Sequence, residues 1–347
     1  MEVAFILGKD AHYYGAGIKP FVDISIGLNL VGATPYILLR KNQKIALKEI
    51  KEITEEKVNL ITYEDLEEAI HSLRPEFLVT QDYSMKTLKG FSKQKKIVYA
   101  QILHGLNVLN KYSSRKSIKF TMGSLVPWPI LTREYVKTLN KFDYIFTNSE
   151  FTRDILLYLY ATRPAGVVYP PVGTNLRKYI GFLQTERKEG ILVYLGHFPD
   201  FYLRNVFEEM KNLKMRKNIP IRLIVDNEVK LKTNDFEVYS GLSSQELAQL
   251  YSKSRITYTP TVNEMFGHVG AESLLFSTPA IIDSYHPFLE FFPNDTNAVK
   301  IARPNSSIYQ TYEEMLDSNI DIIRAKEFIM NEYSPSKSAQ RFIQLLS

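Results

Sequence analysis

Cysteine is absent from the 347-residue chain and histidine is scarce. Without cysteine, the chain cannot form disulfides, thiolate nucleophiles or cysteine zinc sites. No two histidines are three or four residues apart, so a helical metal pair is excluded. The sequence also contains no Asp-x-Asp motif, whereas a divalent cation at a phosphate site needs convergent carboxylates. We therefore expect no metal and no cofactor.

Long apolar runs and a targeting segment are also missing. No run approaches the roughly 20 apolar residues that would span a bilayer. The start, Met1–Gly8, resembles a buried strand leading into a loop and lacks the basic start and cleavage site of a signal peptide. We expect a cytoplasmic protein, at most peripheral to a membrane. Its net charge of +5 suits acidic small molecules or an anionic surface and is too small to indicate nucleic acid.

Short apolar runs alternate with helical patterns along the chain. In the first half the runs lie at residues 3–7, 36–39, 58–62, 77–80, 97–103 and 143–147. In the second half they lie at residues 191–195, 222–225, 236–239, 256–259 and 280–282. Strands that alternate with helices predict parallel sheets covered on both faces. The pattern therefore predicts two α/β domains in tandem.

The prolines Pro170 and Pro171 and the polar stretch up to Gly190 interrupt this alternation. Such a stretch is typical of a domain boundary. We predict an N-terminal Rossmann-like domain over residues 1–178 and a C-terminal one over 179–325. A C-terminal helix over 326–347 is expected to pack back on the N-terminal domain. Ligands of such sheets bind at the carboxyl ends of the strands.

The segment 254–283 combines a strand, a loop and a helix start with two carboxylates. Glu264 lies in the loop, and Glu272 lies about one turn into the helix. Glu264 could accept hydrogen bonds from sugar hydroxyls, and Glu272 could accept them from a ribose diol. Gly267 and Gly270 allow a close backbone approach, and the helix N-terminus offers free N–H groups to an anion.

This segment resembles the E-x7-E signature of the retaining GT-B glycosyltransferases often called family 4. Residues 142–153 (FDYIFTNSEFTR), 167–172 (VVYPPV) and 236–251 (FEVYSGLSSQELAQLY) resemble further segments of that family, in the same order. Gly15 and Gly17 match its glycine-rich loop after the first strand. The resemblance implies an α/β GT-B fold, with two Rossmann-like domains whose parallel sheets face each other across a cleft.

The resemblance also implies roles for individual residues. Glu264 would contact the transferred sugar, Glu272 the donor ribose, and His104 the donor sugar. The first loop would approach the diphosphate at Gly15 and Gly17. Phe266 is in register with the signature, and three amides of the helix start would face the sugar and phosphates: those of Gly267, His268 and Val269.

Two departures concern the phosphate contacts and the glycines of the signature. The family has Gly-Arg after the first strand of its second domain and a lysine about six residues later, whereas this chain has Gly196-His197 and no such lysine. Arg204 is the nearest cation that could replace them, and His197 lies at the arginine position. Met265 and Ser277 stand where the family usually has glycine.

The resemblance implies a metal-independent, retaining hexosyltransferase that moves a sugar from a nucleoside-diphosphate sugar to a glycan, lipid-linked or protein acceptor in glycan biosynthesis. Two alternatives remain open: a catalytically degenerate sugar-nucleotide-binding subunit of a glycan-assembly complex, and a same-fold sugar-nucleotide epimerase. An oxidoreductase lacks support, because neither half carries the complete glycine fingerprint.

The acceptor side offers fewer signals. The basic run Lys86–Lys96, with Leu88 and Phe91 interleaved, is either a solvated face or a contact with anionic lipid. Trp128 lines the acceptor side or packs in a loop. Asn148 and Ser149 are interpreted as a helix cap.

Overall fold

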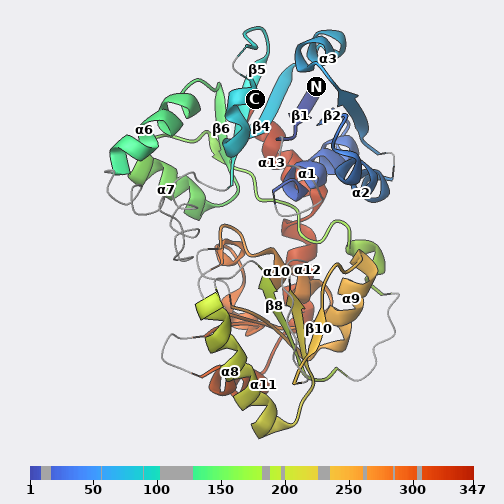
Figure 1. Ribbon diagram of the computed structural model, residues 1–347, viewed down its shortest axis with the longest axis vertical. Helices are drawn as coiled ribbons and strands as arrows, with labels where there is room; N and C mark the ends of the chain where they lie inside the picture. The colour runs from blue at the N-terminus through green and yellow to red at the C-terminus, as the bar shows by residue number, and fades with distance from the viewer. Residues whose placement is uncertain are drawn as a thin grey trace. The chain divides into compact units, whose positions relative to one another are not determined.

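The chain divides into two compact units, seen here in a computed structural model (Figure 1). The first unit comprises Met1–Pro171 and Tyr333–Ser347, and the second comprises Val172–Glu332. The structure describes residues 1–8, 17–55, 57–88, 90–101, 128–181, 188–196, 200–225, 235–260, 264–283, 286–302 and 307–347.

The division between the units lies at Pro171, before the boundary expected after residue 178. The stretch that follows is tied into the second unit, where Arg177 donates hydrogen bonds to the carbonyls of Val172 and Met330 at 3.0 Å each. The returning segment begins at Tyr333 rather than at residue 326, because the helix that ends at Glu332 belongs to the second unit.

The first unit contains a seven-stranded sheet with the strand order β3-β2-β1-β4-β5-β6-β7. All its neighbouring strands are parallel. The order runs outward from β1 in both directions, as in a Rossmann domain. The strands are β1 (Glu2–Ile6), β2 (Thr34–Arg40), β3 (Asn59–Tyr63), β4 (Phe77–Gln81), β5 (Lys95–Ala100), β6 (Tyr144–Thr147) and β7 (Gly166–Val167).

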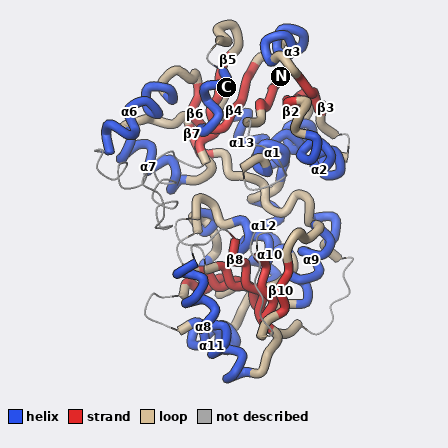
Figure 2. Tube along the Cα trace, viewed as in Figure 1, coloured by secondary structure: helices blue, strands red, loops and turns tan. Residues whose placement is uncertain are grey.

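Helices flank this sheet, as Figure 2 shows. They are α1 (Lys19–Leu30), α2 (Lys44–Thr54), α3 (Leu66–Leu73), η1 (Asp82–Leu88, a 3₁₀ helix), α6 (Trp128–Leu139), α7 (Glu150–Tyr160) and α13 (Pro335–Gln344). Helix α1 is buried along most of its length because the sheet and α13 both pack on it. The rings of Phe5 and Phe21 lie 5.2 Å apart in this core, and Phe342 of α13 packs edge-on to Phe146 at 5.2 Å.

The second unit contains a six-stranded sheet with the order β10-β9-β8-β11-β12-β13. Its strands are also parallel. They are β8 (Ile191–Gly196), β9 (Ile221–Val225), β10 (Glu237–Tyr239), β11 (Ile256–Thr259), β12 (Ala280–Ile282) and β13 (Val299–Ile301). The apolar runs read from the sequence thus form the strands of two parallel sheets, and the predicted two-domain α/β fold is confirmed.

The helices of the second unit are α8 (Asp200–Lys217), α9 (Ser244–Lys253), α10 (His268–Leu275), α11 (Ile308–Leu316) and α12 (Ile322–Glu332), with short 3₁₀ helices η2 (Arg177–Tyr179), η3 (Pro287–Leu289) and η4 (Asn294–Thr296). Helix α9 begins with a capping box in which Ser243 and Glu246 satisfy each other's backbone N–H groups. Helix α10 follows β11 and therefore begins at the carboxyl edge of the sheet.

Candidate functional site

Glu264 lies in the loop between β11 and α10, among backbone amides. Burial raises the pKa of its carboxyl group, and hydrogen bonds from the amides of Gly267, Phe266 and Met265 oppose that rise. The residue as a whole is partly exposed. A carboxylate in such a loop can accept hydrogen bonds from hydroxyl groups of a ligand.

Gly267 is the residue immediately before α10, and its backbone is left-handed, with φ +92°. A Cβ at this position would lie 2.7 Å from both Cβ and Cγ of His286, which is fully buried. The glycine was expected to permit close approach of a ligand. In the structure, the group that approaches it is the imidazole ring of His286.

The first turn of α10 places three predicted residues next to one another. His268 and Val269 are partly exposed. Phe266 is buried at 2% exposure, and its ring centroid lies 4.9 Å from that of His268. The N–H groups of a first helical turn lack partners inside the helix and carry the positive end of its dipole. This turn can therefore bind an anion such as a phosphate.

Glu272 lies on the same helix and is 7% exposed. Its Oε2 accepts a hydrogen bond from the hydroxyl of Tyr251 in α9 at 3.4 Å. Burial and the nearby Glu272 both raise the pKa of Tyr251, so this tyrosine stays a neutral donor. Gly173, with φ +60°, lies close to the side chain of this glutamate, because a Cβ there would lie 3.8 Å from Cγ of Glu272. Tyr251 and Gly173 were not singled out from the sequence.

In the first unit, Gly17 lies at the carboxyl edge of the sheet. Its carbonyl accepts hydrogen bonds from the side chains of Gln81 and Gln101, the latter at 2.7 Å. Gln81 ends β4, and Gln101 directly follows β5. Both glutamines were missed, although the sequence contains a signal for each: Gln81 directly follows the apolar run 77–80, and Gln101 interrupts the run 97–103.

A second polar cluster lies at the end of β4. Asp82, 3% exposed, accepts a hydrogen bond from the hydroxyl of Tyr135 in α6 at 3.2 Å. Burial and the charge of Asp82 raise the pKa of Tyr160 in α7. The carboxylate of Asp82 thus forms a hydrogen bond with α6 and acts through its charge on a tyrosine of α7.

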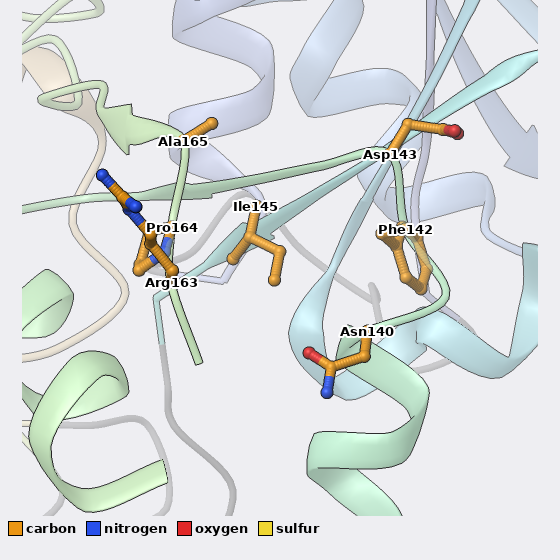
Figure 3. Close-up of a pocket in the computed structure, with 7 residues that line it drawn as sticks. All are labelled: Asn140, Phe142, Asp143, Ile145, Arg163, Pro164 and Ala165. Atoms are coloured by element: carbon orange, nitrogen blue, oxygen red, sulfur yellow. The ribbon is translucent and has the colours of Figure 1, made fainter. Parts of the chain in front are cut away.

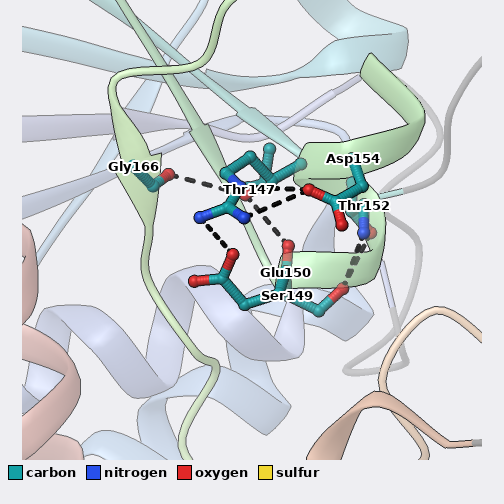
Figure 4. A network of polar contacts seen from close by, with 7 residues as sticks. Thr147, Ser149, Glu150, Thr152, Asp154 and Gly166 are labelled. Carbon is teal, nitrogen blue, oxygen red and sulfur yellow. Dashed lines mark hydrogen bonds and ion pairs between the residues drawn. The ribbon is translucent and has the colours of Figure 1, made fainter. Parts of the chain in front are cut away.

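The start of α7 is capped as expected. Ser149 accepts a hydrogen bond from the amide of Thr152 at 3.1 Å, and Thr147 donates one to the carbonyl of Ser149 at 3.1 Å (Figure 4). Arg153 forms ion pairs with Glu150 and Asp154. Ser149 is therefore the N-cap residue of α7, and the charged residues of its first turn pair with one another.

Several predicted site residues fall outside the described part of the chain, namely Gly15, His104 and His197. Arg204 lies in α8, but its side chain is not among those that the structure describes, and the same holds for Trp128 in α6. Their roles remain predictions. Of the predicted site residues, the structure describes those of Glu264–Glu272 in the second unit and, separately, Gly17 in the first.

The basic run Lys86–Lys96 is anchored by its apolar residues. Leu88 is 1% exposed and belongs to a hydrophobic cluster of the first unit, and Phe91 packs against that cluster. These two side chains are therefore used in the core and are not presented to a bilayer. Lys86, Lys93 and Lys95 are exposed.

A cavity of about 580 Å³ lies at the opposite edge of the first sheet (Figure 3). The residues that line it precede β6 and β7, except for Ile145, which lies in β6: Asn140, Phe142, Asp143, Ile145, Arg163, Pro164 and Ala165. None of them was predicted as a site residue. Parallel α/β sheets bind ligands at the carboxyl ends of their strands, so this cavity does not coincide with the candidate site.

The residues that the structure describes contain no group of three or more acidic or histidine side chains that could hold a metal ion. None of the helices that the structure describes is both long and apolar enough to cross a membrane.

No protein-family model matches the sequence, and a search of curated proteins returned no match. Solved structures do match the fold. A glycosyltransferase from Rickettsia africae superimposes with a TM-score of 0.69 at 14% identity, over 99% of this chain and 97% of the other. HepE from Anabaena, solved in complex with UDP-glucose, gives 0.67 at 11% identity, over 100% and 99%.

A third similar structure belongs to a different class of enzyme. A Listeria monocytogenes protein assigned as a UDP-N-acetylglucosamine 2-epimerase superimposes with a TM-score of 0.57 at 12% identity, over 99% of this chain and 94% of the other. Identities this low establish the fold alone, which is the GT-B fold of two Rossmann-like domains.

Proposed function

We propose that this chain is a glycosyltransferase that uses a nucleoside-diphosphate sugar as donor. The observation that carries the proposal is the Glu264–Glu272 segment. It places a carboxylate on a partly exposed residue, the first turn of α10 and a second carboxylate in succession, following β11. These groups suit a sugar, a diphosphate and a ribose, because carboxylates accept hydrogen bonds from hydroxyls and a helix N-terminus binds phosphate.

The donor would bind through distinct contacts along this segment. Glu264 would accept hydrogen bonds from hydroxyls of the transferred sugar. The amides of His268 and Val269 would bind the diphosphate, because the amide of Gly267 already donates to Glu264. Glu272, oriented by the hydroxyl of Tyr251 at 3.4 Å, would accept from the ribose diol. UDP is the first nucleotide to test, since HepE of the same fold was solved with UDP-glucose.

The finer features follow from the resemblance to family 4. The reaction would retain the anomeric configuration and need no metal, and the departing diphosphate would be stabilised by the α10 amides with Arg204 and His197. His104 would orient the sugar, while Gly15 and Gly17 would approach the diphosphate. The acceptor would be a glycan, a lipid-linked sugar or a protein, and the exposed lysines of the Lys86–Lys96 run would contact anionic lipid.

An epimerase is the second candidate, because the Listeria protein has the same fold. It would bind the same donor and return an altered sugar nucleotide without an acceptor. A degenerate binding subunit is the third, favoured by His197 at the position where the family has arginine.

The first experiment measures thermal stabilisation by UDP, GDP, ADP, dTDP and their sugars, on the natural chain and on Glu272→Ala. A ligand at a hundred times its Kd stabilises a protein by about 2.7 kcal/mol, enough for a clear shift in Tm. We expect a shift with one nucleotide class that Glu272→Ala abolishes. Glu327→Ala, which changes an acidic residue on α12 instead, is the matched control and should keep the shift.

The products then separate the candidates. Incubation with the binding sugar nucleotide, with and without EDTA, should release the nucleoside diphosphate only if the chain transfers or hydrolyses the donor. An altered sugar nucleotide would identify the epimerase, and binding without turnover would identify the degenerate subunit. If no nucleotide shifts the Tm, the donor site does not exist.

A further inference from the structure

Residues 286–288, which come after β12, contact the start of α10. His286 is fully buried, and a Cβ at Gly267 would lie 2.7 Å from its Cβ and Cγ and closer still to Nδ1. Real Cβ atoms do not approach other atoms this closely. Any side chain at position 267 would therefore clash with His286 unless one of the two residues moved.

Two further contacts fasten the same segments together. The amide of Phe288 donates a hydrogen bond to the carbonyl of Phe266 at 3.0 Å. The ring of Phe288 would lie 3.3 Å from a Cβ at Gly270, one turn further along α10. His286 and Phe288 thus contact the start of α10 at two successive glycines, on either side of a backbone hydrogen bond.

We propose that His286 is a positioning residue for the donor site. Its ring holds Gly267 in the left-handed conformation, φ +92°, which turns the chain from the Glu264 loop into α10. Glu264 accepts hydrogen bonds from the amides of this same turn, so the ring also sets where that carboxylate lies. The role is steric: the bulk of the side chain limits where Gly267 can move.

This inference rests on the proposed function, because it assumes that the amides of His268 and Val269, which follow Gly267, face the donor. His286 itself needs no contact with the donor. Its side chain acts through the backbone that it touches, in the way that residues outside a binding site fix the geometry of those inside it.

The test compares three variants of the full chain. His286→Ala removes the ring. His286→Leu replaces it with an apolar side chain of similar volume, a change that cores tolerate best. Phe236→Ala is the matched control, because Phe236 is a buried aromatic residue in the same unit that stacks on Phe207, in the cluster that contains α8. All measurements are made at a temperature where circular dichroism shows every variant to be folded.

Hydrogen exchange of residues 264–275 without nucleotide tests the positioning. We expect faster exchange in His286→Ala and near-natural exchange in His286→Leu and Phe236→Ala. UDP affinity, by calorimetry, tests the consequence: His286→Ala should bind UDP about tenfold more weakly, the equivalent of roughly one charge-assisted hydrogen bond. His286→Leu should retain the natural affinity.

The outcomes distinguish the inference from the proposed function. Unchanged exchange in His286→Ala, or exchange in His286→Leu as fast as in His286→Ala, would overturn the steric role. Loss of UDP binding in His286→Leu equal to that in His286→Ala would show that the imidazole nitrogens bind the donor directly, and would also overturn it. If the natural chain binds no UDP, the UDP-donor proposal fails, and exchange alone then decides whether His286 positions α10.

Discussion

Glu264 and Glu272 are two glutamates of one segment with different surroundings. Glu264 lies among three amides of its own loop, yet burial still raises its pKa above the ordinary value. Glu272 is 7% exposed and accepts a hydrogen bond from the hydroxyl of Tyr251. The local backbone defines the first environment, and a residue of another helix defines the second. Two carboxylates placed in this way can serve different parts of one ligand.

A change at Glu264 should make stability depend less on pH. Because the folded pKa lies above the unfolded value of 4.5, the folded state holds more protons in the window between them, and stability falls as pH rises through it. Glu264→Gln removes this loss. We expect the variant to unfold at higher urea concentration than the natural chain at pH 7, with the difference vanishing near pH 4. An equal difference at both pH values would contradict the assignment.

Gly267→Ala tests the contact with His286 in a second way. The variant must bear the strain of a left-handed alanine, about 1–3 kcal/mol, together with a clash that costs a further ~1–3 kcal/mol. Gly181→Ala is the control, because Gly181 has φ +87° and no described atom within 4 Å of its added Cβ. Chemical denaturation should show a larger loss for Gly267→Ala. Equal losses of stability in the two variants would mean that His286 can shift away from a Cβ at position 267 without a measurable loss of stability.

At the scale of the element, α10 is held at both ends by residues that precede or follow strands. His286 contacts its start, and Lys188 contacts its end, where the Nζ of this lysine donates to the carbonyls of Phe276 and Ser277 at 2.7 and 2.8 Å. Ser277 is left-handed, with φ +56°, at the position where family 4 has glycine. The lysine thus binds carbonyls at the helix end where a cation interacts favourably with the helix dipole.

Lys188 should give the second unit a characteristic pH dependence. Burial, with Lys326 nearby, lowers its pKa from 10.5 to about 8. In this window the unfolded state binds more protons than the folded one, so this contribution to stability rises with pH from about 8 to 10.5. Screening at the part-exposed site limits it to about 1–3 kcal/mol.

The variant Lys188→Met should lack that rise, which urea unfolding at pH 7.5, 9 and 10.5 would measure. Lys253→Met, a substitution at the end of α9, is the control and should keep the rise in stability with pH. The assignment of a lowered pKa to Lys188 would be contradicted if the stability of the natural chain, relative to Lys188→Met, did not rise between pH 7.5 and 10.5.

At the scale of the whole molecule, the first unit is completed by the last part of the chain. Helix α13 packs on α1, and Gly27 leaves room for the backbone of Pro335. Phe342 is fully buried between Phe5 and Phe146, at 6.1 and 5.2 Å. The first unit therefore cannot be complete until residues 333–347 have been made and have docked.

Phe342→Ala should destabilise the first unit selectively. Deleting a buried phenylalanine costs about 3–5 kcal/mol. We expect hydrogen exchange to rise in residues 1–171 and to change little in 172–332, whereas Phe236→Ala should leave residues 1–171 unchanged and raise exchange around its own cluster, which contains α8. If both variants raise exchange equally throughout, the two units unfold as one.

The sequence by itself determined the elements and the order of the site residues. Apolar runs long enough for strands alternate with helical patterns, and this alternation is a local property that specifies parallel α/β sheets. The cap signal at Asn148 and Ser149 predicted the start of α7. The spacing of Glu264 and Glu272 placed one carboxylate in the loop and the other inside the helix, because helix geometry is set by neighbours along the chain.

Only the tertiary structure decided what lies against each element. The ring that restricts Gly267 comes from His286, beyond a strand and a loop, and no local pattern relates these two positions. The partner of Glu272 comes from α9, and the carbonyls at the end of α10 are bound by a lysine before β8. Such contacts depend on how strands pair and helices cross, which the spacing of residues along one segment does not determine. The boundary between the units lies before residue 178 for the same reason. Arg177 donates a hydrogen bond to the carbonyl of Met330, which lies far along the chain in the second unit.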